Sequence, residues 1–351
     1  MSPQLWRAGE WFLRSGIQQP NGGVARYYRT DRTCNAPVST EITGYAISTL
    51  VYLHSLRHDE RYIEAASRAA RFLTRVAWNR EMAAMPFEID PPAYSYFFDC
   101  GIIVRGLLAA WRASGDDEFL DGAVAVGQSM MRDFASDKGD FHPIIALPSK
   151  TPEPRDRMRW SRSAGCYQLK AAMAWWDLFE ATGDNCFREP YQRVLEYSLE
   201  RDDEFLLHPE QSGVMDRLHA YSYFLEGLLP FVNQPRCVSA LSGGIVRLYA
   251  LLRKIAPEFA RSDVYAQLLR VRLFADWAGA VALDGLAASE EAAALAGFQA
   301  SDADLRINGG YWFGRKGGEV LPYVNPVSAA FAGQALELWE NRAQINRHLL
   351  I

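Results

Sequence analysis

A junction between two helices recurs along the chain, and this repeat constrains the fold more than any other feature. It reads RHDERY at residues 57–62, SGDDEF at 114–119 and TGDNCF at 182–187. Glycine in the last two can end a helix by taking a left-handed conformation. The aspartate can cap the next helix by accepting its free N–H groups. We expect the aromatic residue three positions later to dock the second helix on the first, so the repeat predicts helical hairpins.

The two helices of each hairpin differ in composition. The helix before a junction is apolar and rich in small residues, whereas the helix after it is more polar. This contrast is typical of the inner and outer helices of a closed double ring. We expect six inner helices, which begin near Glu41, Asp99, Ser163, His219, Asp263 and Pro326. The prediction is an all-α, (α/α)6 toroid that forms a single domain over residues 1–351, with short β-ribbons in the loops of one rim, near residues 24–28 and 311–313.

Composition excludes several classes of protein. The chain has 37 Lys and Arg against 42 Asp and Glu, a net charge of −5, which disfavours a nucleic-acid partner. No run approaches the roughly 20 apolar residues that a membrane helix needs. The first residues lack the basic and apolar pattern of a signal peptide. The five cysteines are widely spaced and form no CxxC pair. We therefore expect reduced thiols, a cytoplasmic location, and neither disulfides nor a zinc site.

The loops that lead into the inner helices carry the unusual residues of this chain. In a ring whose inner helices run the same way, these loops gather at one rim and mark the functional face. Six helix N-termini at that rim favour anionic ligands. The 10 Trp, 16 Tyr and 18 Phe fit either a large helical core or a sugar-binding cleft. An acidic sugar is therefore one ligand that this rim could hold.

The first two rim loops hold candidates for sugar binding and acid catalysis. Arg26 can grip a carboxylate in bidentate fashion, while Tyr27 and Tyr28 can stack on a sugar ring. The alternative is an ordinary surface ribbon. Asp99 follows a run of aromatic residues, which would raise its pKa as a general acid requires. Glu41 stands in the first turn of a helix. As ordinary helix-start residues, both acids would need no catalytic role.

The later loops add a histidine and several polar side chains. His219, Tyr223 and Glu226 fall on one helical face, and histidine is the natural proton carrier near neutral pH. A structural histidine is the alternative. These three residues include no second soft ligand that would make a metal site. No Walker loop, GxSxG elbow or HExxH motif occurs, so we expect no metal and no cofactor. The remaining side chains expected to contact a sugar are Tyr96, Trp160, Arg162, Tyr223, Gln267, Arg270 and Trp312.

Several short segments carry a resemblance to a known group of proteins. They are the Gly-Gly loop at 22–28, STEITGY at 39–45, FDCGIIVRG at 98–106, HAYSYFLEGL at 219–228, DVYAQLLR at 263–270 and NPVSAAFAGQALELW at 325–339. Together they resemble the six-hairpin (α/α)-toroid group of carbohydrate-active proteins. The later segments are similar to the C-terminal toroid of glucuronyl C5-epimerase-like proteins. The 351 residues contain no β-rich region beside the toroid, and no local motif pairs two catalytic carboxylates.

This resemblance implies an enzyme acting on an oligo- or polysaccharide, including a uronate-containing one. Related toroids host hydrolases, lyases and epimerases, and the fold alone does not choose among them. A glycoside hydrolase is the first expectation, with Asp99 as general acid and Glu41 as its base or nucleophile partner.

Two other functions stay open. In a uronate C5-epimerase or polysaccharide lyase, His219, Tyr45 or Tyr223 would move the proton. Arg26 or Arg162 would neutralise the substrate carboxylate. The last alternative is a non-catalytic glycan-binding protein of polysaccharide biosynthesis.

Overall fold

The computed structural model describes residues 1–137, 139–156, 159–206, 213–342 and 345–351, and helices dominate it. The chain divides into two compact units whose segments alternate along the sequence. Unit 2 contains residues 18–25 and 37–202, and unit 1 contains residues 1–17, 26–36 and 203–351. Single turns of helix occur at η2 (Trp160–Arg162), η3 (Asn185–Phe187), η4 (Asp202–Glu204), η5 (Leu229–Phe231) and η7 (Arg347–Leu349).

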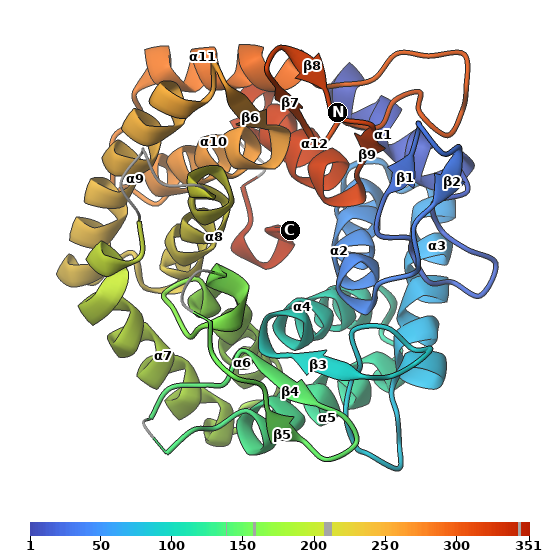
Figure 1. Ribbon diagram of the computed structural model, residues 1–351, viewed down its shortest axis with the longest axis vertical. Helices are drawn as coiled ribbons and strands as arrows, with labels where there is room; N and C mark the ends of the chain where they lie inside the picture. The colour runs from blue at the N-terminus through green and yellow to red at the C-terminus, as the bar shows by residue number, and fades with distance from the viewer. Residues whose placement is uncertain (138, 157–158, 207–212, 343–344) are drawn as a thin grey trace. The chain divides into compact units, whose positions relative to one another are not determined.

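Unit 2 contains three helical hairpins. They are α2 (Thr40–Arg57) with α3 (Glu60–Arg71), α4 (Phe97–Ser114) with α5 (Asp117–Asp133), and α6 (Gln168–Thr182) with α7 (Arg188–Arg201). The first helices of the hairpins pack on one another, α2 on α4 and α4 on α6, and each second helix packs on its own first helix (Figure 1). The first helices are buried over most of their length, so they form the core of this unit.

The predicted junctions are confirmed at all three places. Gly115 and Gly183 end their helices in the left-handed conformation, and His58 takes the same conformation (φ 53°) where the other junctions have glycine. The aspartate side chains accept a backbone N–H from two residues further on, at Asp59, Asp116 and Asp184. The aromatic residues that follow are buried against the hairpins, as predicted for Tyr62, Phe119 and Phe187.

Glycines allow the inner helices of unit 2 to approach closely. A Cβ on Gly106 would lie 2.5 Å from the carbonyl oxygen of Gly44, so α2 and α4 touch backbone to backbone there. Gly101 likewise faces the backbone of Ala171 on α6. The backbone that approaches Gly101, two residues after Asp99, therefore belongs to a neighbouring helix.

We expect Gly106→Ala to destabilise the protein by about 1–3 kcal/mol, because the added methyl group must force α2 and α4 apart. Gly243→Ala is the matched control. Gly243 lies inside a helix with nothing within 4 Å of its Cβ position, so alanine there should add up to about 1 kcal/mol through helix propensity. Urea unfolding of the two variants measures both effects. Equal stabilities would contradict the close approach.

Unit 1 also contains three pairs of packed helices. They are α8 (Val214–Gly227) with α9 (Pro235–Ile255), α10 (Ser262–Trp277) with α11 (Gly285–Ala296), and α12 (Pro326–Glu340) with α1 (Pro3–Arg14). In Figure 1, α10 lies between α8 and α12 and packs on both. These three helices are buried along most of their length, as expected of inner helices.

Two inner helices begin elsewhere than predicted. The predicted start at Ser163 is wrong, because a 3-10 turn and a loop occupy that region and α6 begins at Gln168. There the Gln168 side chain accepts the backbone N–H of Gly165 and so closes the turn before the helix. The predicted start at His219 is also wrong, because α8 already begins at Val214, so His219 lies one turn inside the helix.

Short antiparallel sheets precede three inner helices. In unit 2, β4 (Ile144–Ala146) pairs with β3 (Tyr94–Tyr96) and β5 (Thr151–Pro152). In unit 1, β1 (Tyr28–Arg29) pairs with β2 (Cys34–Asn35) and β9 (Tyr323–Val324), and β7 (Gly314–Lys316) pairs with β6 (Phe259–Arg261) and β8 (Glu319–Val320). The ribbons predicted at 24–28 and 311–313 are confirmed only in part, because Val24, Ala25, Tyr311 and Trp312 form isolated β-bridges and the strands themselves begin later, at Tyr28 and Gly314.

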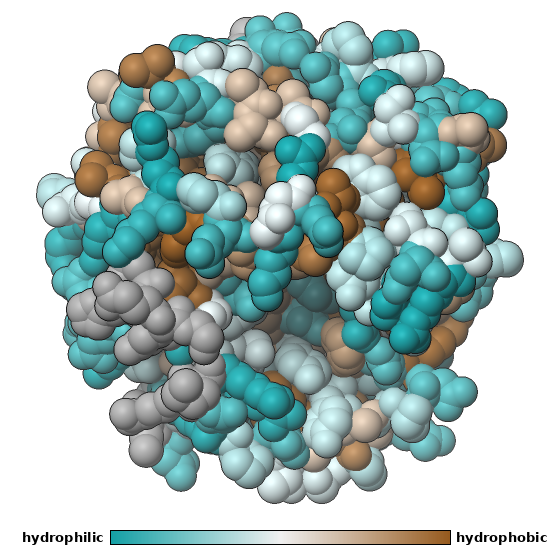
Figure 2. Space-filling view, turned by 45° about the horizontal axis from the view of Figure 1, so that its top comes forward, coloured by the Kyte–Doolittle hydropathy of each residue, from teal (hydrophilic) through white to brown (hydrophobic). Residues whose placement is uncertain are grey.

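Among the described residues, no helix combines the length and the apolar character needed to cross a bilayer. The face in Figure 2 is mostly hydrophilic, and its hydrophobic patches are small and scattered. All five cysteines are free thiols.

Candidate functional site

In unit 1, the N-terminal halves of α8 and α10 bring a histidine, a carboxylate and a carboxamide together. The Nδ1 atom of His219 lies 2.7 Å from Oε1 of Gln267 and 3.5 Å from Oδ2 of Asp263. Asp263 and Gln267 are one helical turn apart, so both face α8. All three side chains are at least nine-tenths buried. We call these residues, together with Arg261 and Asp216, the His219 cluster.

Arg261 holds the charge of this cluster in place. It ends β6 directly before α10, and its Nε and Nη2 donate to the two oxygens of Asp263 at 3.0 and 2.5 Å. Its Nη1 donates to Asp216 at 2.6 Å, and its guanidinium lies 4.5 Å from the ring centre of Phe313. Because Arg261 occupies both carboxylate oxygens and brings a positive charge, the cluster is a poor site for a metal cation.

Burial controls the protonation of His219. Burial, assisted by the positive charge of Arg261, lowers the pKa of His219 to about 4. Burial alone would raise the pKa of Asp263, but Arg261 holds it below its usual value. At neutral pH the imidazole is therefore neutral and Asp263 is ionised. Since Gln267 offers its carbonyl oxygen to Nδ1, the proton sits on Nδ1 and the lone pair sits on Nε2.

This pKa predicts a pH-dependent stability. The unfolded histidine binds a proton near pH 6.5, whereas the folded one binds it only near pH 4, so the folded state is favoured above pH 6.5. This contribution should be lost as the pH falls from 6.5 to 4 and should amount to about 3 kcal/mol by pH 4. Urea unfolding at pH 7 and pH 4.5 measures it. His219→Asn should depend less on pH, and parallel behaviour of the two proteins would contradict the shift.

Aromatic side chains lie beside the His219 cluster. The ring of Tyr223 meets that of His219 edge to face at 4.6 Å between centres. Phe313 and Tyr323 are half-buried neighbours, and Tyr27 packs on Tyr323 at 5.1 Å. Flat apolar faces beside polar groups suit a sugar, whose C–H faces stack while its hydroxyls form hydrogen bonds.

The other sequence candidates of unit 1 occupy varied surroundings. Trp312 is half-buried, and its carbonyl oxygen accepts the Ser262 hydroxyl at the start of α10. Arg26 is half-buried on the segment before β1, and Tyr28 is buried in β1. Within this unit, the structure therefore brings His219, Tyr223 and Gln267 together.

Arg270 belongs to a buried polar network one turn further along α10 from Gln267. Its guanidinium donates to Glu226 at 2.5 Å, to Gln334 at 3.1 Å and to the carbonyl oxygen of Ile351 at 3.1 Å. Both Arg270 and Glu226 are fully buried. The sequence suggested that Arg270 contacts a sugar, but its guanidinium binds these groups of the protein instead.

In unit 2, the charge of Asp99 acts on the buried hydroxyl group of Tyr167. Asp99 is almost completely buried in the first turn of α4. Burial, with a contribution from the charge of Asp99, raises the pKa of Tyr167. Trp160 meets Tyr167 edge to face at 5.0 Å. The structure thus places Asp99 and Trp160 around Tyr167, a residue that the sequence did not single out.

The remaining unit 2 candidates come from α2, β3 and the turn η2. Glu41 is half-buried in the first turn of α2, and Tyr45 is buried one turn further on. Tyr96 packs on Phe87 at 5.0 Å. Arg162 forms a longer ion pair with Glu153 at 3.8 Å.

Arg261 is the main residue that sequence reasoning missed. The sequence showed Arg261 two positions before Asp263, but nothing local indicated that both would reach His219 and Asp216, which lie more than 40 residues away. An arginine beside a buried aspartate at a helix start is the one signal that could have indicated a charged site.

Comparisons with known proteins give a fold. Neither models of protein families nor curated protein sequences match this chain. Among solved structures, a D-mannose isomerase has a TM-score of 0.71 at 10% identity, and the match covers 96% of each chain. Cellobiose 2-epimerase from Spirochaeta thermophila has a TM-score of 0.69 at 15% identity, with 93% of each chain covered. A family 76 α-mannanase from Bacteroides thetaiotaomicron has a TM-score of 0.66 at 12% identity, with 98% of each chain covered.

These matches extend over almost the entire chain. They show that the chain has the all-α fold of the six-hairpin (α/α) toroid, as the sequence predicted. At such low sequence identity, the matches identify the fold but do not identify an activity.

Proposed function

We propose that this protein is a carbohydrate-active enzyme that moves a proton at C2 of a reducing sugar, as an aldose–ketose isomerase does. The observation that carries the proposal is a buried, neutral His219, held by Gln267 and beside the ionised Asp263. A neutral imidazole can remove a proton, and a nearby carboxylate stabilises the cation that forms. Matched structures described as an isomerase and an epimerase support this choice.

The chemistry requires only one base. Nε2 of His219 takes the proton from C2 of the open-chain aldose, and the C2–H electron pair forms the C1–C2 double bond of an enediolate. The π electrons of the C1 carbonyl move to O1, and the proton of the C2 hydroxyl then passes to O1. The same imidazolium returns its proton to C1 as the C2–O2 double bond forms, which gives the ketose without any net change in electrons. Return of a proton to C2 from the opposite face would give the epimer instead, and that step needs a second proton donor.

The other residues of the His219 cluster position the imidazole for proton transfer. Gln267 fixes the ring of His219 through Nδ1, so that Nε2 carries the lone pair. Asp263 lies close enough to stabilise the imidazolium, while Arg261 keeps this carboxylate ionised. The aromatic residues Tyr223 and Phe313 provide apolar faces for the sugar and exclude water.

The experiment is an incubation with D-mannose, D-glucose, cellobiose and D-glucuronate in D2O, followed by NMR. We expect one of these sugars to lose its H-2 signal and to form a ketose. Formation of the C2 epimer would indicate epimerisation. Absence of both exchange and product with all four sugars would contradict proton transfer at C2.

A glycoside hydrolase is the second candidate, because Asp99 is a buried carboxylate whose charge acts on Tyr167 and a matched structure is an α-mannanase. In this function Asp99 would be the general acid and Glu41 the second carboxylate. An assay for reducing ends released from mannan and acidic polysaccharides distinguishes it. Asp99→Asn should abolish such release, whereas the isomerase would keep its turnover in that variant.

A further inference from the structure

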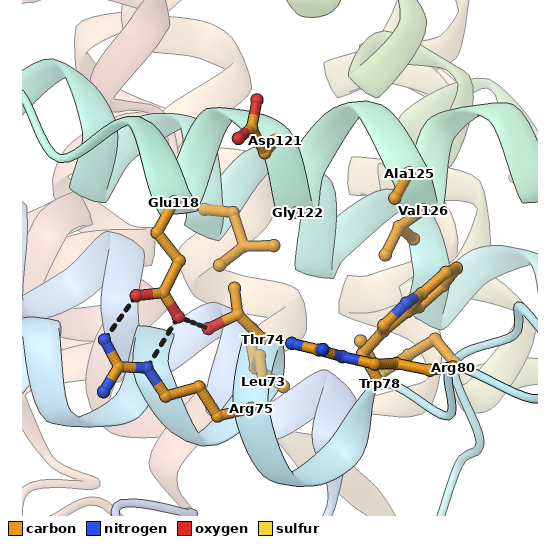
Figure 3. A pocket seen from close by; sticks show the side chains of 12 residues that line it. Leu73, Thr74, Arg75, Trp78, Arg80, Glu118, Asp121, Gly122, Ala125 and Val126 are labelled. Atoms are coloured by element: carbon orange, nitrogen blue, oxygen red, sulfur yellow. Dashed lines mark hydrogen bonds and ion pairs between the residues drawn. The ribbon is translucent and has the colours of Figure 1, made fainter.

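A pocket of about 640 Å³ lies on unit 2, and its lining contains none of the candidate site residues named above (Figure 3). It opens between α5 and η1 (Phe72–Ala77), the π-helix that continues α3. Its floor is apolar, with buried side chains from Leu73, Met85, Leu107 and Val126. This volume lies within the range of small-molecule sites.

The π-helix sets one wall of the pocket. Its wider turn ends where the backbone N–H of Trp78 donates to the carbonyl oxygen of Leu73, which places the half-buried indole at the pocket edge. On the facing helix, a Cβ at Gly122 would lie 2.7 Å from Cγ2 of Thr74, so glycine lets α5 approach η1 closely. Single π-helical turns are rare and are frequent at functional sites.

Four charged side chains line the pocket, and their charges cancel. Arg75 binds Glu118 through two nitrogens at 2.8 and 2.5 Å, and the Thr74 hydroxyl donates to the same carboxylate. Among the described residues, Arg80 and Asp121 have no hydrogen bond or ion pair. Figure 3 shows the guanidinium of Arg80 extending into the pocket beside Trp78, with Asp121 on the α5 edge.

We propose that this pocket binds a short neutral saccharide. An indole beside an apolar floor suits the C–H face of a sugar ring. The unpaired Arg80 and Asp121 offer donors and acceptors to hydroxyl groups, and the zero net charge of the lining favours no ion of either sign. Because this site lies on unit 2 and the proposal does not rest on proton transfer at His219, the two proposals fail independently.

The test follows the indole N–H resonance of Trp78 in the intact protein by NMR, assigned from its loss in Trp78→Phe. Cellobiose and mannobiose are titrated as neutral probes, and D-glucuronate as the charged probe. We expect a saturable shift with a neutral disaccharide and a weaker response to glucuronate. Ala125→Leu, which fills the pocket from α5, should weaken neutral binding by about 10-fold or more.

Two control variants separate this site from other sugar contacts. Trp277→Ala removes an exposed indole of unit 1, and His219→Asn removes the proposed base. Neither should change the titration of Trp78. A Trp78 resonance that does not move with either disaccharide overturns the proposal. Tighter binding of glucuronate, or full binding in a folded Ala125→Leu protein, overturns it as well.

Discussion

Replacing His219 with asparagine is expected to lower kcat for sugar isomerisation by roughly 10²–10⁴-fold, because the variant lacks the base that takes the C2 proton. Asparagine keeps a polar group near Gln267, so the fold should remain intact. Deuterium exchange at C2 should fall together with product formation. His142→Asn is the matched control. His142 also has a pKa below its usual value because of burial, but it lies in unit 2, and its removal should leave turnover unchanged.

Gln267→Glu tests how the base is positioned. A carboxylate at this place would accept the same Nδ1 proton but would add a negative charge beside the imidazole. It should therefore raise the pKa of His219 above about 4. The acid limb of the kcat/KM profile should move to higher pH, a change that a purely structural role would not produce. Full turnover in His219→Asn, or an unmoved acid limb in Gln267→Glu, would refute the assignment of His219 as base.

The largest effect on stability is expected at Arg270. Arg270→Leu should destabilise the protein by roughly 3–5 kcal/mol, because it leaves the fully buried Glu226 carboxylate without its guanidinium. The change also removes the donor to Gln334 and to the carbonyl oxygen of Ile351. Urea unfolding measures the loss, and adding Glu226→Leu should recover a large part of it.

An exposed ion pair provides the control for Arg270. Arg61 binds the helix-capping Asp59 at 2.7 Å, but its side chain is mostly exposed. Arg61→Leu should therefore change the free energy of unfolding by less than about 1 kcal/mol. Similar losses in Arg61→Leu and Arg270→Leu would show that burial does not determine the value of these pairs.

Helical hairpins could be predicted because their signals are local. A left-handed residue at position 58, 115 or 183 and the capping aspartate that follows act within a few residues of the chain. Alternation of apolar and polar helices then indicated which helices are buried. Predictions failed where side chains close a turn, as Gln168 does before α6, because such contacts depend on loop geometry.

The candidate site could be predicted only in part. The face shared by Asp263 and Gln267 and the histidine at position 219 are visible in the sequence. Their contact is not, because His219 and Gln267 are 48 residues apart. The role of Arg261 was missed for the same reason. The pocket beside Trp78 was not predicted either, because no sequence pattern distinguishes the π-helix η1 from the α-helix before it.

The sequence by itself determined the helical hairpins, their caps and their buried faces, because periodicity and capping act over one or two helical turns. Only the tertiary structure decided the chemistry of the buried polar groups. Because α8 packs on α10, His219 lies beside the carboxamide of Gln267 and the carboxylate of Asp263. The end of β6 supplies Arg261, which binds that carboxylate. The pKa of a buried side chain depends on groups that the fold brings near it, and those groups are far away along the chain.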